Sequence, residues 1–268
     1  MGITKKASSV AFGRGKRSKC GAIADHLWTM IREMPRQLLQ VTFFRFVLSA
    51  ARYVWFAKAL GGLKTASAPS KGVAETTIFH NQRGMFDLAV ERSLRLIRPL
   101  VALEWVRNHF DDRTILTIGP RTEGEILSLI AHGFRRKNIT AIDLISYSPM
   151  IQIGDMHDLP FPDGSFDVAL VGWVLSYSED KERAAVEILR VVRSGGLVAI
   201  GVEWSKLTPE QYGQDVGYII GSKERLSNLQ AVLDLFHGSV ETVYFSQDDQ
   251  ARSTDEIGDI LVIFRKPN

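Results

Sequence analysis

The chain has 268 residues, of which 45% are hydrophobic and 24% are charged, so it can form one large domain plus an appendage. Its single cysteine, Cys20, excludes an internal disulfide framework and a cysteine-based metal site. The net charge of +3 conceals an asymmetry, because residues 1–64 carry +10 and the rest of the chain carries −7. We expect no metal site and no nucleic-acid partner, and the sequence does not predict an oligomeric state.

The first 20 residues are basic. Between Lys5 and Lys19 there are six basic residues and no acidic one. This composition predicts a disordered tail over residues 1–20. A transit peptide has the same features, so organellar targeting remains an alternative to a cytoplasmic location.

Residues 21–72 are predicted to form an amphipathic helical segment and a linker. Leu38–Leu60 is the most apolar stretch of the chain, but Arg45 and Arg52 would each cost roughly 2.5–3.5 kcal/mol near the centre of a membrane-spanning helix. Arg45, Ser49 and Arg52 recur at helical spacing, which favours an amphipathic helix. Three roles stay open for it: a core helix, a lid over the substrate, or docking of residues 1–60 on an anionic membrane surface.

A small-residue linker at residues 65–72 separates this segment from the predicted domain, residues 73–268. Covering helices are expected over residues 83–110, with a break at Pro99. The polar residues His80 to Arg83, ahead of these helices, are predicted to form a solvated loop, or alternatively to face the substrate.

Four short apolar segments separated by turns and helices predict a doubly wound α/β sheet. They are Ile115–Gly119, Ile139–Asp143, Phe166–Val171 and Leu197–Val202. Ser222 is expected to cap a helix over residues 223–236, because its hydroxyl can accept a free amide of the first turn. Two strands, Val240–Phe245 and Ile260–Arg265, are expected to close the sheet.

A series of short motifs accompanies these strands. Asp143 ends the second strand, Asp155 and Met156 precede a Leu-Pro-Phe triplet at 159–161, Phe166-Asp167 opens a strand, and Gly195-Gly196 precedes another. From Ile115 to Lys266 the chain resembles the class I S-adenosylmethionine-dependent methyltransferases, in particular the type 11-like group. The resemblance implies a Rossmann-like sheet, mostly parallel with an antiparallel last strand. The predicted helical segment before it is then an N-terminal appendage to this fold.

The resemblance also implies the cofactor, S-adenosylmethionine, and the residues that hold it. Asp143 would take the ribose hydroxyls, and Asp155 with Met156 would hold the adenine. The remaining cofactor-binding positions would lie in the turn after the first strand and at the end of the fourth: Gly119, Pro120, Arg121, Glu123, Gly172 and Trp173.

Two features depart from the family pattern. The family has an acidic residue followed by three alternate glycines, whereas here Thr117 takes the acidic position and only Gly119 remains. Arg121 and Glu123 occupy the other two glycine positions, and their bulky side chains either point away from the ligand or replace some of its contacts. In the second case, Glu123 or Glu125 would meet an ammonium group of the ligand, and Arg121 would meet a carboxylate. The interval between Asp143 and Asp155 is also too short for a full crossover helix, so the fold is abbreviated or residues 151–153 form a short edge strand.

Methyl transfer is an in-line displacement that requires positioning more than a metal, and a base only where the acceptor loses a proton. His157 is the best candidate for a base, although it could instead hydrogen-bond within its loop. Tyr177 is a further candidate catalytic residue and, with Trp204, is expected to line the substrate pocket. Trp204 could equally be a core residue.

The sequence therefore predicts a methyltransferase that methylates a small molecule at oxygen or nitrogen. The altered glycine loop leaves a non-catalytic binding or scaffolding protein as the main alternative. A nicotinamide-dinucleotide enzyme is a weaker one, because the segment from Gly119 to Gly124 lacks the inner glycines.

Overall fold

The computed structural model describes residues 35–66, 73, 77–85, 92–208, 210–211, 214, 222, 224–249 and 257–268. The predicted basic tail, most of the predicted linker and the stretch from 86 to 91 lie outside these residues.

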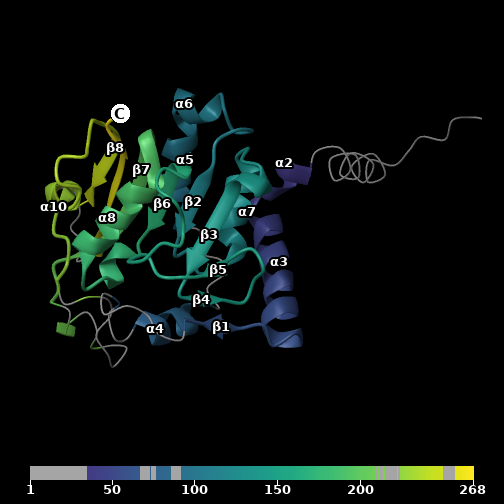
Figure 1. The fold of residues 1–268 in the computed structure, drawn as a ribbon. Coiled ribbons are helices and arrows are strands. Elements are labelled where there is room, and N and C mark those ends of the chain that lie inside the picture. The colour runs from purple at the N-terminus through teal and green to yellow at the C-terminus, as the bar shows by residue number, and fades with distance from the viewer. Residues whose placement is uncertain are drawn as a thin grey trace, which may run out of the picture.

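A seven-stranded sheet forms the centre of the fold, in the order β5-β3-β2-β6-β7-β9-β8 (Figure 1). The pairs from β5 to β7 are parallel, and β9 is antiparallel to both its neighbours. The strands are β2 (Ile115–Ile118), β3 (Ile139–Asp143), β5 (Gln152–Ile153), β6 (Phe166–Gly172), β7 (Val192–Ser205), β8 (Thr242–Asp248) and β9 (Ile257–Arg265). The predicted doubly wound sheet with an antiparallel last strand is confirmed.

The short interval after β3 holds no crossover helix. Ile142 and Asp143 instead pair in parallel with the two residues of β5, Gln152 and Ile153. The predicted short edge strand is therefore present, and it follows β4 (Ile145–Ser146), which pairs with β1 (Lys64–Thr65). Thr65, placed in the linker by the sequence, thus belongs to a small sheet.

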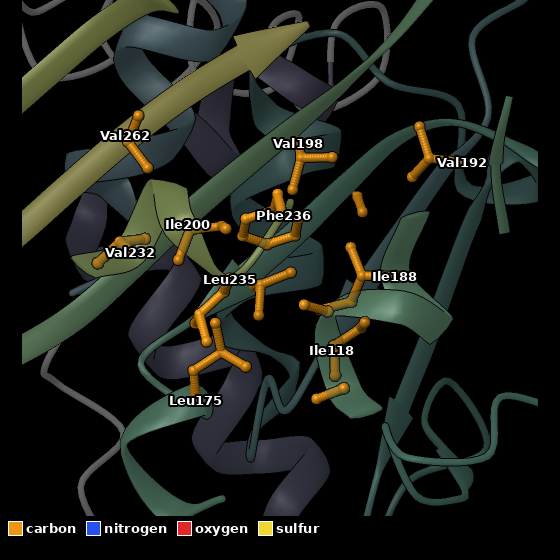
Figure 2. Close-up of a cluster of buried hydrophobic side chains, with 14 of the residues drawn as sticks. Ile118, Leu175, Ile188, Val192, Val198, Ile200, Val232, Leu235, Phe236 and Val262 are labelled. Atoms are coloured by element: carbon orange, nitrogen blue, oxygen red, sulfur yellow. The ribbon is translucent and has the colours of Figure 1, made fainter. Parts of the chain in front are cut away.

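Helices cover both faces of the sheet, which explains why the central strands β2 and β6 are buried along almost their whole length. On one face, α8 (Lys181–Val191) and α10 (Leu229–Asp234) contribute to a core around Ile188 and Phe236 (Figure 2). On the other face lie α5 (Leu94–Ala102), α6 (Glu104–Arg107) and α7 (Glu123–Ala131).

Two predicted helix boundaries are wrong. α5 continues through Pro99, and the break comes at Leu103, whose backbone is extended. Leu96, Ile97 and Leu100 are fully buried on both sides of the proline, so packing outweighs its lost hydrogen bond. Ser222 does not cap a helix among the described residues, because its hydroxyl accepts a hydrogen bond from the Lys181 ammonium at 2.8 Å. Asn228 caps α10 instead, and its side chain accepts a hydrogen bond from the amide of Ala231.

Within residues 35–59 the predicted amphipathic segment is mostly helical and lies at the outer edge of the fold beside α7 (Figure 1), whereas its residues 21–34 lie outside the described part of the chain. It comprises α2 (Pro35–Gln40), α3 (Thr42–Tyr53) and the π-helix η1 (Val54–Ala59). No helix among the described residues is both long enough and apolar enough to cross a membrane. Residues 80–83, predicted as a loop, belong to a helix, α4 (Thr77–Gly84).

Candidate functional site

A cavity of about 410 Å³ opens beyond the carboxyl ends of β2, β3 and β6, where doubly wound folds bind ligands. The predicted site residues that line it are Gly119, Pro120, Arg121, Asp143, Asp155, Met156, Gly172, Trp173 and Tyr177. Glu123, His157 and Trp204, which the sequence also assigned to the site, do not line it. Strands far apart in sequence thus bring most of the predicted set together.

The glycine loop keeps one position that requires glycine. Gly119 has φ +72°, and a Cβ there would overlap the Cγ1 methyl of Val174. Arg121 also has positive φ, +53°, although it is not a glycine. Its amide donates to Asp143 Oδ2 at 2.8 Å, which helps to offset a left-handed conformation that costs about 1–3 kcal/mol.

Trp173, directly after β6, is the third residue at the cavity with a positive φ, which is +63°. Its amide donates to the Gly201 carbonyl, and its indole Nε1 donates to Asp259 on β9 at 2.7 Å. The antiparallel strand therefore holds a cavity wall in place. Arg92, above the indole at 5.2 Å, was missed because residues before β2 carried no motif.

Glu123 points away from the cavity, so its expected contact with the cofactor is wrong. The carboxylate is fully buried and accepts hydrogen bonds from the Arg52 guanidinium, at 2.9 Å for Nη2, and from the Ser148 hydroxyl. Its own amide donates to the Tyr147 hydroxyl. Glu123 thus joins α7 to α3, a contact that local sequence could not reveal.

Glu125, two residues further along α7, does line the cavity. Its carboxyl group meets the hydroxyl of Thr117 on β2, the position at which the motif pattern expects an acid. Burial, with a contribution from the negative charge of Asp143, raises the pKa of Glu125 to about 8. A buried carboxyl group beside a cavity is suited to receive a cation.

Asp143 lies where the resemblance placed it. Oδ1 accepts the amide of Ile145 at 3.2 Å and Oδ2 accepts that of Arg121, which leaves further lone pairs on both oxygens for a ligand's hydroxyls. Burial raises the pKa of Asp143, and the two backbone amides oppose that rise.

His157 orients Asp155 and does not line the cavity, which favours the alternative that it hydrogen-bonds within its loop over the role of a base. Nδ1 lies 2.6 Å from Asp155 Oδ1, and Nε2 lies 2.7 Å from the hydroxyl of Ser178. Both ring nitrogens are therefore engaged within the loop. This order of Asp, His and Ser has the connectivity of a hydrolytic triad, but Ser178 is fully buried and cannot meet a substrate.

Tyr177 lines the cavity from η3 (Leu175–Tyr177), and the His80 ring stacks on it at 5.3 Å. Burial raises the pKa of Tyr177 and lowers that of His80. Asn81, beside His80 on α4, accepts from Arg121 at 3.2 Å and also lines the cavity. Of the four residues expected in a solvated loop, Asn81 thus lines the cavity and His80 packs on a residue that does.

Trp204 is a core residue, which corrects its assignment to the substrate pocket. It is buried in the cluster between the sheet and α10. On β7, alternate side chains face opposite sides of the sheet, and Trp204 shares its side with Val202 and Ile200.

Within the described part of the chain, no group of three or more His, Cys, Asp or Glu side chains is arranged to hold a metal ion. The residues around the cavity do fit S-adenosylmethionine. The buried carboxyl groups of Glu125 and Asp143 and the partly exposed one of Asp155 can meet an ammonium and hydroxyls, and Arg121 can meet a carboxylate. Gly119 keeps the backbone accessible to a ligand.

Comparisons with known proteins agree with this architecture. Residues 116–200 match the family described as "Methyltransferase domain". A demethylmenaquinone methyltransferase of Desulfitobacterium hafniense (strain Y51) is 40% identical over 70 residues, which are 25% of this chain and 27% of that protein. The ajmaline N-methyltransferase of Rauvolfia serpentina is 40% identical over 48 residues, 18% of this chain and 16% of that protein. This chain therefore spans about a quarter or less of the length of these relatives.

Among solved structures, a methyltransferase in complex with the Haloferax volcanii Trm112 methyltransferase activator has the same fold. It matches with a TM-score of 0.51 and 17% identity over 72% of this chain and 96% of that chain.

Proposed function

We propose, on the premise that residues 116–200 belong to the class I S-adenosylmethionine-dependent methyltransferase family, that this protein methylates a small molecule at oxygen or nitrogen. The observation that carries the proposal is the convergence of Gly119, Asp143 and Asp155 on one cavity at the carboxyl ends of the strands. Bound S-adenosylmethionine would supply an electrophilic methyl group on a sulfonium.

Glu125 would hold the ammonium of the methionine moiety. The family acid is replaced by Thr117, and the carboxyl group of Glu125 reaches the Thr117 hydroxyl from the neighbouring helix. An ammonium beside Glu125 would favour its ionised form and offset its burial. Arg121 would pair with the carboxylate of the same moiety.

Asp143 would bind the ribose hydroxyls, and Asp155 with Met156 would hold the adenine. His157 fixes the Asp155 carboxylate by two contacts, its amide at 2.9 Å and Nδ1 at 2.6 Å. Pre-orientation of this kind reduces the ordering that binding requires.

The acceptor would enter beside Tyr177, Trp173 and Asn81. Because its pKa is raised, Tyr177 stays protonated at neutral pH and can donate a hydrogen bond to the acceptor. The rings of Tyr177 and Trp173 can stabilise a neighbouring cationic centre. These residues would act by positioning and excluding water, which is what an in-line methyl transfer requires.

One observation favours the second candidate, a binding protein without turnover. Arg121 occupies a glycine position of the family loop, and its guanidinium lies at the cavity wall. A side chain there narrows the space for a ligand. The methyltransferase would transfer methyl groups, and the binding protein would not. The two would differ in binding of S-adenosylmethionine only if the Arg121 side chain closed the cavity to it.

Titration calorimetry with S-adenosylmethionine and S-adenosylhomocysteine tests the proposal, and NAD serves as the comparison ligand. We expect binding of the two sulfur compounds and not of NAD. Asp143→Ala and Asp155→Ala should each weaken binding severalfold, whereas Asp112→Asn, on the exposed surface, should not. A folded protein that binds neither sulfur compound would refute the cofactor assignment; binding with no methyl transfer to any acceptor in a small-molecule panel would favour the second candidate.

A further inference from the structure

The helix α3 has Arg45 and Ser49 on its buried side and apolar residues on its exposed side, the reverse of an ordinary surface helix, and the exposed apolar side continues into η1. Arg45 and Ser49 are each only 1% exposed, whereas Phe43 is 66% and Trp55 is 59% exposed. We call the exposed side the apolar face, and it consists of Phe43, Phe44, Val47, Leu48, Val54 and Trp55.

The apolar face is continuous along the helix. Phe44, Leu48 and Trp55 follow one another at spacings of four and seven, and Phe43, Val47 and Val54 form a parallel row. Figure 1 shows α3 along the outer edge of the fold, beside α7. A contiguous exposed apolar surface of this kind marks an interaction site, unlike apolar residues scattered singly.

Buried polar contacts fix the orientation of α3. Arg52 pairs with the fully buried carboxylate of Glu123 on α7. Arg45 donates to the Leu39 carbonyl and to the Thr42 hydroxyl, which secures the break between α2 and α3. Turning the apolar face inward would leave the Glu123 charge buried without its partner, so the face stays outward.

The charge of this region identifies the partner. Residues 35–74 contain six basic residues and no acidic one, and Arg36, Lys58 and Lys64 are exposed. Residues 1–64 carry +10 in all. A second copy of the chain would bring an equal positive charge to the same face, and the two would repel each other. A partner whose surface is negatively charged and whose interior is apolar would match both the positive charge of this region and its apolar face.

We propose that the apolar face docks on an anionic phospholipid bilayer, with α3 and η1 lying in the plane of the interface. Phe43, Phe44 and Trp55 would enter the boundary between headgroups and acyl chains, where aromatic rings are favoured. The exposed basic residues would lie near the anionic headgroups. This inference is independent of the proposed activity, because no residue of the apolar face lines the cavity.

Vesicle sedimentation with the full-length chain tests the proposal. We expect it to bind vesicles of phosphatidylcholine with phosphatidylserine, and to bind them more weakly as salt is added. Val54→Gln combined with Trp55→Gln should reduce the partition coefficient at least about tenfold, because two exposed side chains lose their apolar contact with lipid. The summed emission of the five tryptophans should shift to shorter wavelength on binding, and this shift should be smaller when Trp55 is replaced.

The matched control combines Val186→Gln with Tyr244→Gln, two apolar residues on other surfaces that are 51% and 45% exposed. It should bind vesicles like the unaltered chain. The proposal is overturned if the unaltered chain does not bind anionic vesicles, if pure phosphatidylcholine binds equally well, or if the control loses binding as strongly. A dimer in sedimentation velocity that disappears in the Val54 and Trp55 variant would overturn it in favour of self-association.

Discussion

The carboxyl group of Glu125, on α7, meets the hydroxyl of Thr117, on the neighbouring strand β2. A residue of a helix thereby places a carboxyl group next to the strand position that lacks one, and this residue also lines the cavity. A buried acid is therefore present beside the glycine loop, but it lies at position 125 and not at position 117, where the family motif has its acid.

Glu125→Gln should weaken binding of S-adenosylmethionine by about tenfold to a hundredfold, because it removes one charge-assisted hydrogen bond worth about 1.5–3 kcal/mol. Titration calorimetry measures the change. Glu182→Gln, an exposed acid at the start of α8, is the control and should bind normally. Equal affinities for Glu125→Gln and the unaltered protein would show that the ammonium lies elsewhere.

The stability of the ligand-free protein should fall as pH rises through the range in which Glu125 titrates. Its pKa is about 8 in the folded protein against a usual value of 4.5, so between these limits the folded state binds more protons than the unfolded state. The contribution is fully present below about pH 4.5 and is lost toward about pH 8, by up to about 1 kcal/mol per pH unit.

Urea unfolding at several pH values measures this slope. Glu125→Gln should flatten most of it and should make the ligand-free protein more stable near neutral pH. Asp143, whose pKa is also raised, should leave a smaller residual slope of the same sign. A slope that Glu125→Gln leaves unchanged would assign the proton uptake to other groups.

Gly119→Ala should destabilise the protein by more than the left-handed backbone alone explains. Ala at φ +72° costs about 1–2 kcal/mol, and its Cβ would also overlap the Val174 methyl. Gly238→Ala is the matched control: its φ is +77° and nothing lies within 4 Å of the added Cβ. Chemical unfolding should show a larger loss for Gly119→Ala, and adding Val174→Ala should recover the difference. Equal losses for the two glycines would argue against the close approach to Val174.

His157→Asn should weaken S-adenosylhomocysteine binding severalfold, because Asp155 loses the ring that orients it. Calorimetry with this demethylated product separates positioning from base catalysis, since no methyl group is transferred on binding. Unchanged affinity together with lost methyl transfer would restore the role of His157 as a base.

The sequence by itself determined the sheet and most of the cavity. The apolar strands, the turn signals and the acids that end strands are local patterns, and parallel strands carry their carboxyl ends to one edge regardless of detail. Gly119, Asp143, Asp155 and Tyr177 could therefore be placed at one site before any distance was known.

Tertiary structure decided the direction of individual side chains. Glu123 and Glu125 are two residues apart on one helix, and only the packing of α3 shows that the first pairs with Arg52 while the second reaches the cavity. His157 and Trp204 were equally ambiguous, because their environment comes from segments distant in sequence. The sequence also showed the amphipathic pattern of α3 but not which side of this helix is buried. The contact of Arg52 with the buried carboxylate of Glu123 determines that the polar side of α3 faces inward and its apolar side outward.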